Sequence, residues 1–309
     1  MSETVLVVGA TLLDTKGKPN EGLAPNTSNP ATIRVTRGGT ARNVAENLGL
    51  LGADVVLISA VGDDLLGHRL KEQTAVSGVN VDHVQVIANE NTGVYMAILE
   101  EDGSMSVALD DVHVMQHVSP EYLYEHRQLF KEAAFVVMDG SLTPNAMGMV
   151  VNLCGRYDVP LVADPSSARL AYKLRPYLSH LHLVVPNENE AAELVQIGTI
   201  GDDPDLSLDL ARSLVQAGVE NAIVTLTDFG LAYATSQEIG YVPPNYSKMV
   251  DSTGTGDAVT AAIIFGMLNN LPTMQAIRLG ASAAGLTLQT AETVVPDLSL
   301  DMLYDNLIV

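Results

Sequence analysis

The stretch that decides the fold is DSTGTGDAVTAAIIFGML, residues 251–268. Gly254 and Gly256 flank Thr255, Asp257 follows, and an apolar run completes the segment. Glycines let the backbone turn sharply, and the first turn of a helix leaves its N–H groups free. Successive N–H groups and the positive end of the helix dipole together favour an anion. The sequence therefore predicts an anion site where this helix begins.

Asp257 has two interpretations in this setting. It can be an acidic residue in the first turn that only complements the helix dipole. Alternatively, the helix end neutralises a phosphoryl group in transfer while Asp257 accepts the proton of an attacking hydroxyl. The second interpretation explains why a carboxylate stands beside a site for an anion. The spacing of this short motif leaves both open.

Composition limits the classes of partner. The chain has 309 residues, and 16 Lys and Arg against 37 Asp and Glu give a net charge of −21. A surface this acidic repels nucleic-acid polymers and anionic membranes, so neither is expected as a partner. An anionic substrate would have to be held by local devices such as helix N-termini or a metal.

The same composition predicts one folded domain over residues 1–309. Hydrophobic residues make up 47% of the chain, enough for a full core. Cys154 is the single cysteine, so no intramolecular disulfide or cysteine metal cluster can form. The N-terminus has no basic region, and no apolar run approaches the roughly 18 residues of a membrane helix. These features predict a soluble, cytoplasmic protein.

Strand-like and helix-like segments alternate along the chain. The strand-like runs are TVLVVG, DVVLISAVG, AAFVVMDG, VPLVADP, LHLVVPN and NAIVTLT. The helical patterns are TARNVAENLGLLG, LLGHRLKEQTAVSG, SPEYLYEHRQLFKEA, TPNAMGMVVNLCGRY, NENEAAELVQI and LSLDLARSLVQAG, followed by residues 257–269 and 273–289. The runs are rich in Val, Ile and Leu and lack strict alternation, as in strands buried on both faces. This order predicts an α/β fold with a doubly wound, mostly parallel sheet flanked by helices.

Two segments break the alternation. Residues 15–39 are polar and rich in Pro, Asn and Gly, and residues 91–111 place two alternating strands around EEDG. The second pattern indicates a hairpin. Both segments are expected to form a small antiparallel β lid over one end of the sheet.

Two further groups of residues are candidates for a ligand site. Gly38 and Gly39 precede a helix and permit close backbone approach, with Asn43 on the first turn. Asn187 and Glu190 open another helix three residues apart. The first group is either a glycine turn with a capping residue or part of a pocket. The second is either a capping pair or a site where Glu190 orders water around Mg²⁺.

These motifs, in this order, resemble those of the ribokinase-like (PfkB) family of carbohydrate and nucleoside kinases. GGTARNVAENLGLLGADVVLISAVGDD resembles the N-terminal signature of that family and DSTGTGDA its C-terminal signature. PNENE matches its N-x-x-E motif, and VTLTDFG resembles its nucleotide-loop segment with a threonine in place of the first glycine. The resemblance covers nearly the whole chain and implies a ribokinase-like fold that uses ATP with Mg²⁺.

The resemblance also implies roles for individual residues. Asp257 would be the general base, and the backbone of Gly254, Thr255 and Gly256 would form the anion hole. The implied sugar pocket comprises Asp14, Gly38, Gly39 and Asn43, the implied nucleotide site comprises Asn187, Glu190, Thr225 and Gly230, and the implied monovalent-cation loop, for K⁺, starts at Asp251 and Ser252. Thr255 and Ser252 differ from the usual residues of the family, but backbone N–H groups are unaffected by both changes.

Further segments resemble the branch of this family that phosphorylates pseudouridine. They are VVGATLLDTKGKP, TSNPATIRVTRGGTARNVAENLGLLG, VYMAILEEDGSMSVALDDV and VADPSSARL. This resemblance implies transfer of the ATP γ-phosphate to the 5′-hydroxyl of pseudouridine. Lys16, Arg42 and Asp164 belong to it, and each could equally be part of a structural ion pair. Asp139 ends a strand at the edge where such sheets bind ligands, with no role assigned.

Three functions remain open at this stage: a pseudouridine kinase, a kinase of another sugar or nucleoside such as ribose, another pentose, a hexose or uridine, and a ligand-binding regulator without catalysis. The exposed strand edges of the lid, together with the resemblance, further imply a homodimer joined through the lids.

Overall fold

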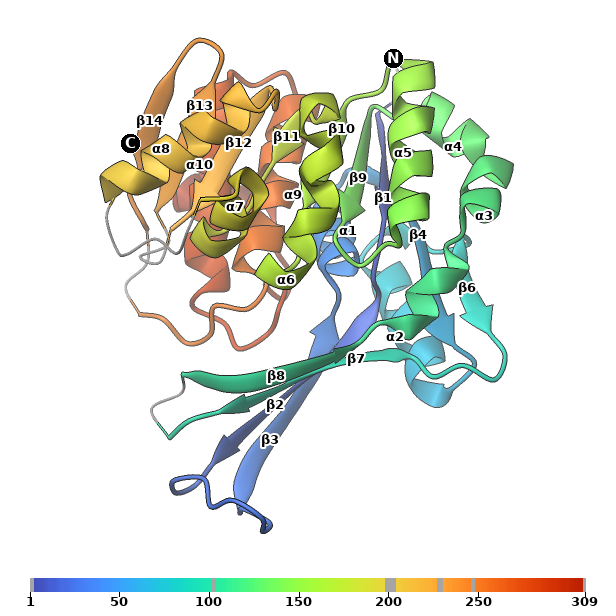
Figure 1. Ribbon diagram of the computed structural model, residues 1–309, viewed down its shortest axis with the longest axis vertical. Coiled ribbons are helices and arrows are strands. Elements are labelled where there is room, and N and C mark those ends of the chain that lie inside the picture. The colour runs from blue at the N-terminus through green and yellow to red at the C-terminus, as the bar shows by residue number, and fades with distance from the viewer. Residues whose placement is uncertain (1–2, 102–103, 198–203, 227–229, 246–247, 308–309) are drawn as a thin grey trace.

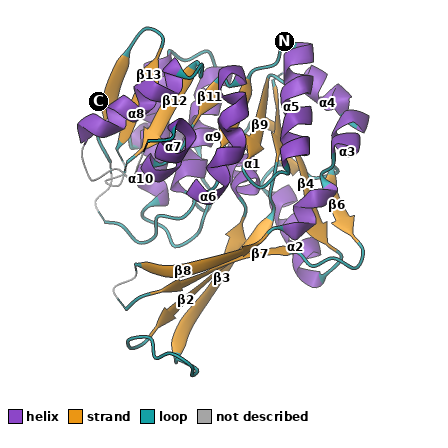
Figure 2. Ribbon diagram, viewed as in Figure 1, coloured by secondary structure: helices purple, strands orange, loops and turns teal. Residues whose placement is uncertain are grey.

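The computed structural model describes residues 3–101, 104–197, 204–226, 230–245 and 248–307. It consists of a large sheet with helices on both faces and a small four-stranded sheet that projects from the main body (Figure 1). This architecture confirms the expected α/β fold with a mostly parallel sheet and a β lid. In Figure 2 the strands of the small sheet extend away from the helices that cover the large sheet.

The large sheet is parallel except at one edge. Its order is β14-β13-β12-β11-β10-β9-β1-β4-β5, and β6 also pairs with β4. The pairings β12–β13 and β13–β14 are antiparallel. The strands are β1 (Thr4–Val8), β4 (Asp54–Gly62), β5 (Val79–Asn80), β6 (Val84–Ile87), β9 (Phe135–Asp139), β10 (Leu161–Asp164), β11 (Leu183–Val184), β12 (Asn221–Thr225), β13 (Leu231–Thr235) and β14 (Ile239–Val242).

Both faces of the sheet are covered, which explains the uninterrupted apolar runs. On β1, Leu6 and Val8 belong to one core cluster, and Val5 and Val7 to another on the opposite face. The helices are α1 (Thr40–Leu50), α2 (Leu65–Val76), α3 (Pro120–Glu125), α4 (Arg127–Glu132), α5 (Pro144–Tyr157), α6 (Ala168–Ala171), α7 (Glu188–Val195), α8 (Pro204–Gln216), α9 (Thr255–Leu268), α10 (Thr273–Thr287) and α11 (Leu300–Asp305), with 3₁₀ segments η1 (His113–His117) and η2 (Tyr172–His180). No helix within the described ranges is long and apolar enough to cross a membrane.

Some elements differ from those expected. The single helix expected from SPEYLYEHRQLFKEA is two short helices, α3 and α4, that meet at His126. There the backbone N–H and the ring Nδ1 of His126 both donate to the Tyr122 carbonyl oxygen, at 3.2 and 2.8 Å. Strand β11 has only two residues, and the antiparallel edge formed by β13 and β14 was not anticipated.

The lid consists of β2 (Leu12–Pro19), β3 (Ala31–Gly38), β7 (Gly93–Leu99) and β8 (Met105–Asp111), in the order β3-β2-β7-β8. The two outer pairings are antiparallel, and the central pairing β2–β7 is parallel. β7 and β8 form the hairpin expected around EEDG, of which residues 102–103 lie outside the described ranges. β2 continues directly from the edge of the large sheet where β1 ends, so the lid begins at the carboxyl ends of the parallel strands.

Candidate active site

Two glycines, Gly254 and Gly256, shape the start of helix α9. Gly254 is the N-cap residue with φ 83°, and a side chain there would collide with the Thr293 carbonyl oxygen. At Gly256, by contrast, nothing lies within 4 Å of the position that a Cβ would take. The Thr255 hydroxyl is buried and has no hydrogen-bond partner among the described residues. The first turn of α9 is therefore open on the side of Gly256, where a bound anion could approach it.

Asp257 lies on the first turn of α9 with 9% of its surface exposed. Asn43 on α1 donates through Nδ2 to Oδ2 of Asp257 at 2.6 Å. Burial raises the pKa of Asp257 to about 7, against the opposing effects of the Asn43 hydrogen bond and the Arg42 charge. A carboxylate that titrates near neutrality can accept a proton during a reaction and release it afterwards.

Asp14 faces the same region from the lid strand β2. Its side chain is 6% exposed, and burial raises its pKa to about 6. Gly38 is required beside it, because a Cβ at Gly38 would overlap the Asp14 carboxylate. Gly39 has φ 97° and passes close to the Ala10 carbonyl oxygen. The predicted sugar-pocket residues are thus gathered around the junction of lid and sheet, and Asp14 acts electrostatically on Asp257.

Lys16 forms the structural ion pair that the sequence left open, and its pairing with Asp251 joins the lid to the loop before α9. Lys16 Nζ on β2 lies 2.7 Å from each carboxylate oxygen of Asp251 and also contacts Oγ1 of Thr253. The pKa of Asp251 is lowered: burial alone would raise it, but the hydrogen bonds from Lys16 and Thr253 outweigh that effect. Ser252, the other residue of the predicted cation loop, is exposed, and its carbonyl oxygen accepts from Thr255 N at 3.3 Å.

Asn187 and Glu190 form a reciprocal capping box at the start of α7. Asn187 Oδ1 accepts from Glu190 N at 3.0 Å, and Glu190 Oε2 accepts from Asn187 N at 2.8 Å. Burial raises the pKa of Glu190 to about 7. Asp164, at the end of β10, is buried, and its pKa is raised first by burial and then by the charges of Asp257 and Glu190. Asn187 and Glu190 therefore form the capping pair. Glu190 is also one of three buried carboxylates, with Asp164 and Asp257, that influence one another electrostatically.

Thr225 ends β12 and borders the start of α7, and Gly230 lies directly before β13. Thr225 N donates to the Pro186 carbonyl oxygen at 2.9 Å, and Thr225 forms an isolated parallel bridge with Asn187. Gly230 lies close to the Tyr241 ring, 2.6 Å from the position of a Cβ. The rest of the VTLTDFG segment, residues 227–229, lies outside the described residues. Of the two predicted nucleotide-side residues, Thr225 is thus adjacent to the capping box.

Asp139 is fully buried, and its carboxylate is engaged by backbone N–H groups. It is 0% exposed and accepts from Ala10 N at 2.8 Å, Ala41 N at 3.1 Å and Ser141 N at 2.9 Å. Ala41 is in the first turn of α1, so a carboxylate from β9 caps this helix across the fold. Asp139 fixes the start of α1 and thereby the position of Asn43.

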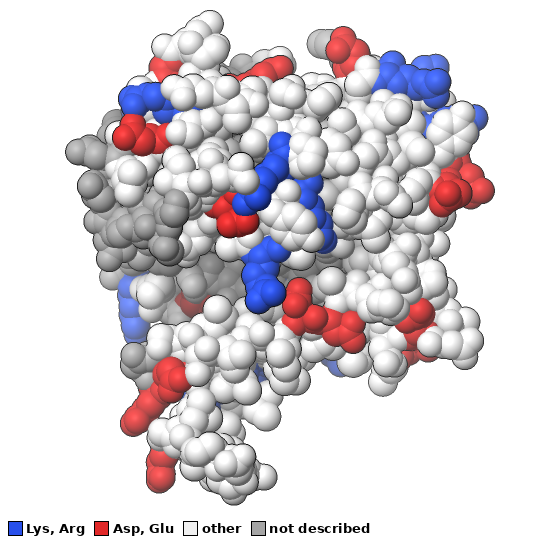
Figure 3. Space-filling view, viewed as in Figure 1, with Lys and Arg blue, Asp and Glu red and all other residues white. Residues whose placement is uncertain are grey.

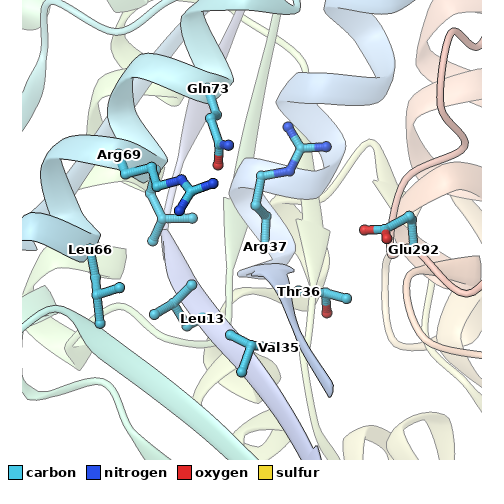
Figure 4. A pocket seen from close by; sticks show the side chains of 9 residues that line it. Leu13, Val35, Thr36, Arg37, Leu66, Arg69, Gln73 and Glu292 are labelled. Atoms are coloured by element: carbon cyan, nitrogen blue, oxygen red, sulfur yellow. The ribbon is translucent and has the colours of Figure 1, made fainter. Parts of the chain in front are cut away.

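A cavity of about 310 Å³ lies elsewhere, between α2 and the base of the lid. Its lining residues include Leu13, Arg37, Arg69 and Gln73 (Figure 4). None of the predicted site residues lines it. On the face shown in Figure 3, Lys and Arg side chains gather near the middle, above the lid, despite the acidic balance of the whole chain.

Comparisons with known proteins agree with this fold. The sequence profile described as pfkB family carbohydrate kinase matches residues 2–299. The chain is 32% identical to the pseudouridine kinase of Escherichia coli strain K12 over 297 residues, 96% of this chain and 94% of that protein. It is 26% identical to the guanosine-inosine kinase of Exiguobacterium acetylicum over 299 residues, 95% and 97% of the two chains. The structure of Arabidopsis thaliana ribokinase complexed with ribose and ATP superposes with a TM-score of 0.83 at 22% identity, covering 98% of this chain and 99% of that one.

Proposed function

The chain belongs to the pfkB family of carbohydrate kinases, and from this membership we propose that it transfers the γ-phosphate of ATP to the 5′-hydroxyl of pseudouridine. Membership of this family supports ATP-dependent kinase activity on a sugar or a nucleoside. The observation that supports phosphoryl transfer is the position of Asp257 on the first turn of α9, which is open on the side of Gly256. The acceptor is proposed from the similarity to the pseudouridine kinase of Escherichia coli, which covers nearly both chains.

In the proposed reaction, Asp257 accepts the proton of the 5′-hydroxyl as its oxygen attacks the γ-phosphorus. A new O–P bond forms, the bond to the leaving ADP oxygen breaks, and the proton remains on Asp257. The N–H groups at Gly254 and Gly256 stabilise the charge on the transferred phosphoryl group, and that of Thr255 would join them on release of its 3.3 Å hydrogen bond to the Ser252 carbonyl oxygen. A pKa near 7 lets the carboxylate be deprotonated before transfer and regenerated afterwards.

The acceptor's ribose is proposed to bind Asp14 and Asn43 between lid and sheet. Asp14 is a buried carboxylate that packs against Gly38, where a Cβ would overlap it, and it can accept hydrogen bonds from two ribose hydroxyls. A ligand without those hydroxyls would leave the carboxylate unpaired, which is costly in a buried site. The lid strand β2 that carries Asp14 is thus proposed to discriminate among acceptors.

The carboxylates of Glu190 and Asp164 fit a hydrated Mg²⁺ near the nucleotide phosphates. Both are buried with raised pKa values, so a nearby divalent cation would offset the electrostatic cost of keeping them ionised. Mg²⁺ keeps several waters and seldom needs a full set of protein ligands. When bound, Mg²⁺ would neutralise phosphate charge. Thr225 and Gly230 would border the adenosine from the neighbouring strand end.

The loop proposed to bind a monovalent cation already has a positively charged side chain beside it. The carboxylate of Asp251 is already engaged by the Lys16 ammonium group. We propose that Lys16 supplies the positive charge that K⁺ would otherwise provide beside Asp251 and Ser252.

A homodimer through the lids is supported by the side chains on one lid face. Val35, Thr15, Met96 and Leu109 form one cross-strand row, and Ile33, Gly17, Ile98 and Val107 the next. Ile33 is 67% exposed, and Leu109 is 66% exposed. Asp14 and Lys16 belong to the alternate rows, which face the large sheet, so the apolar face points away from the proposed active site. An exposed apolar face of this kind suits association with a second copy.

A panel assay of ADP release tests the function. With Mg·ATP we expect turnover of pseudouridine well above that of uridine, guanosine, inosine, ribose and hexoses. Preference for ribose or uridine would overturn the proposed acceptor while keeping the kinase. Stabilisation by a ligand with no ADP release from any acceptor would support a non-catalytic regulator instead.

Replacement of the proposed general base, Asp257, tests the mechanism. Asp257→Asn should lower kcat by about 10²- to 10⁴-fold, the usual contribution of a general base. Asp158→Asn is a matched control, because Asp158 is exposed and lies at the left-handed C-cap of α5, where Asn is well tolerated. Normal turnover in Asp257→Asn would exclude Asp257 as the base.

A further inference from the structure

A continuous chain of polar contacts runs from the base of the lid to Asp257. It begins at Arg37 on β3, whose Nη1 lies 2.9 Å from Oε1 of Glu46 on α1. Figure 4 shows the Arg37 side chain extending from β3 beside α1. Oε2 of Glu46 accepts from Nη1 of Arg42, and Nη2 of Arg42 donates to Oδ1 of Asn43. Asn43 Nδ2 then donates to Asp257 at 2.6 Å.

We propose that Arg42 and Glu46 are positioning residues for phosphoryl transfer, which together hold the Asn43 amide in the orientation that donates to Asp257. The inference rests on the proposed function, because it assigns Asp257 the role of base. Arg42 donates to the Asn43 amide and Glu46 holds Arg42, so both reach Asp257 through Asn43, and Arg42 adds the effect of its charge on that carboxylate. In the sequence, their spacing of four residues on a predicted helix was the available signal.

The orientation follows from the hydrogen-bonding groups present. A guanidinium can only donate, so it selects the oxygen of the Asn43 amide and leaves the NH₂ group to face Asp257. If the amide turned over, its oxygen would face the carboxylate and disfavour the ionised form. Arg42 also donates through Nε to the Gly38 carbonyl oxygen at 2.9 Å, which fixes the guanidinium against the end of the lid strand.

Burial shows that this pair is not a surface feature. Arg42 is 0% exposed and Glu46 is 2% exposed. Glu46 accepts further from Ser77 Oγ at 3.0 Å, and Arg42 donates to Thr293 Oγ1 at 3.3 Å, so the charges have partners on several elements. A buried ion pair seldom adds stability compared with well-packed apolar side chains. Its presence one residue from Asn43 is better explained by the orientation that it imposes.

The electrostatic surroundings of Asp257 set the direction of the expected effect. The charges of Asp14, Asp139 and Asp164 act on it from β2, β9 and β10, and that of Arg42 acts on it from α1. Of these charges, only Arg42 favours the ionised carboxylate. Loss of Arg42 and reversal of the Asn43 amide therefore both displace the titration of Asp257 to higher pH.

The test replaces both charges together, so that neither is left buried without its partner. We expect Arg42→Met/Glu46→Met to fold, to lower kcat by about tenfold or more, and to change KM for ATP by less than about twofold. The acid limb of the kcat profile should move to higher pH. Arg69→Met/Glu72→Met on α2 is the control, because it removes the same charges from exposed positions. An unchanged kcat and pH profile in the folded Arg42/Glu46 variant would overturn the inference.

A double-mutant cycle and a spectroscopic readout separate positioning from general structural damage. In an Asn43→Ala background, adding the Arg42/Glu46 replacements should lower kcat by less than about twofold more, because the group that they orient is absent. Fully multiplicative losses would show that the pair acts independently of Asn43. The ¹³C shift of the Asp257 carboxyl group should also titrate at higher pH in the Arg42/Glu46 variant. This measurement needs no turnover, so it tests the inference even if the acceptor panel fails.

Discussion

Lys16 and Asp251 are 235 positions apart in the chain, yet Lys16 Nζ lies 2.7 Å from both oxygens of the Asp251 carboxylate. Lys16 belongs to the lid, and Asp251 belongs to the loop that leads into α9. Their side chains are 16% and 19% exposed, so solvent screens the pair only partly. The contact ties the strand that carries Asp14 to the loop that presents the anion site.

The first prediction concerns monovalent cations. Because the Lys16 ammonium group already neutralises Asp251, we expect ADP release by the unmodified protein to change by less than about twofold between Na⁺ and K⁺. Lys16→Met should lower turnover and make the remainder depend on K⁺, which then has access to the carboxylate. Lys18→Met, in the next outward position of the same face, is the matched control. A strong K⁺ requirement in the unmodified protein would contradict the proposed role of Lys16.

The second prediction concerns stability and pH. The pKa of Asp257 is about 7 in the folded chain, against an ordinary value of 3.8. Between these values the folded chain holds a proton that the unfolded chain has released, so the free energy of unfolding falls as pH rises through this window. Asp257→Asn removes this loss, and we expect its Tm at pH 8 to exceed that of the unmodified protein by about 2 °C or more.

Near pH 4 the Tm difference between Asp257→Asn and the unmodified protein should be small, because the folded carboxyl group is then protonated. Differential scanning calorimetry across this range measures it. A Tm difference independent of pH would mean that burial of Asp257 does not shift its titration. A pH-dependent gain in stability together with lost activity would mark Asp257 as a site where function costs stability.

The third prediction contrasts the two glycines at the start of α9. Gly254→Ala should lower stability strongly, because φ 83° and the nearby Thr293 carbonyl oxygen leave no room for a methyl group. Gly256→Ala should keep or slightly raise stability, by up to about 1 kcal/mol from helix propensity. Its methyl group would, however, project into the space proposed for the phosphoryl group and lower kcat. Full activity in Gly256→Ala would place the phosphoryl group elsewhere.

The fourth prediction concerns association. Leu109→Lys places a charge on the edge strand β8 of the apolar lid face, and we expect it to convert a dimer into monomers in light scattering at micromolar concentration. Leu65→Lys is the control, because Leu65 is 82% exposed on α2, outside the lid rows. A monomeric unmodified protein would refute the dimer directly, as would dissociation by both variants to the same extent.

Much of the fold follows from local sequence alone. The run DVVLISAVG predicts β4 with the bounds observed, and the apolar segment after Asp257 predicts the buried helix α9. Val and Ile with no polar interruption indicate strands covered on both faces, whatever their neighbours. The start of a helix was also readable where a capping residue marks it, as at Asn187.

The sequence by itself determined which residue types stand at the strand ends and helix starts, because periodicity and turn chemistry act over a few neighbouring residues. Only the tertiary structure decided which of them meet: Asn43 with Asp257, Lys16 with Asp251, and Asp139 with the start of α1. It also decided the raised pKa values of Asp14, Glu190 and Asp257, since these depend on how much water the surrounding elements exclude. Burial and long-range contact are properties of the packed chain, and no local pattern encodes them.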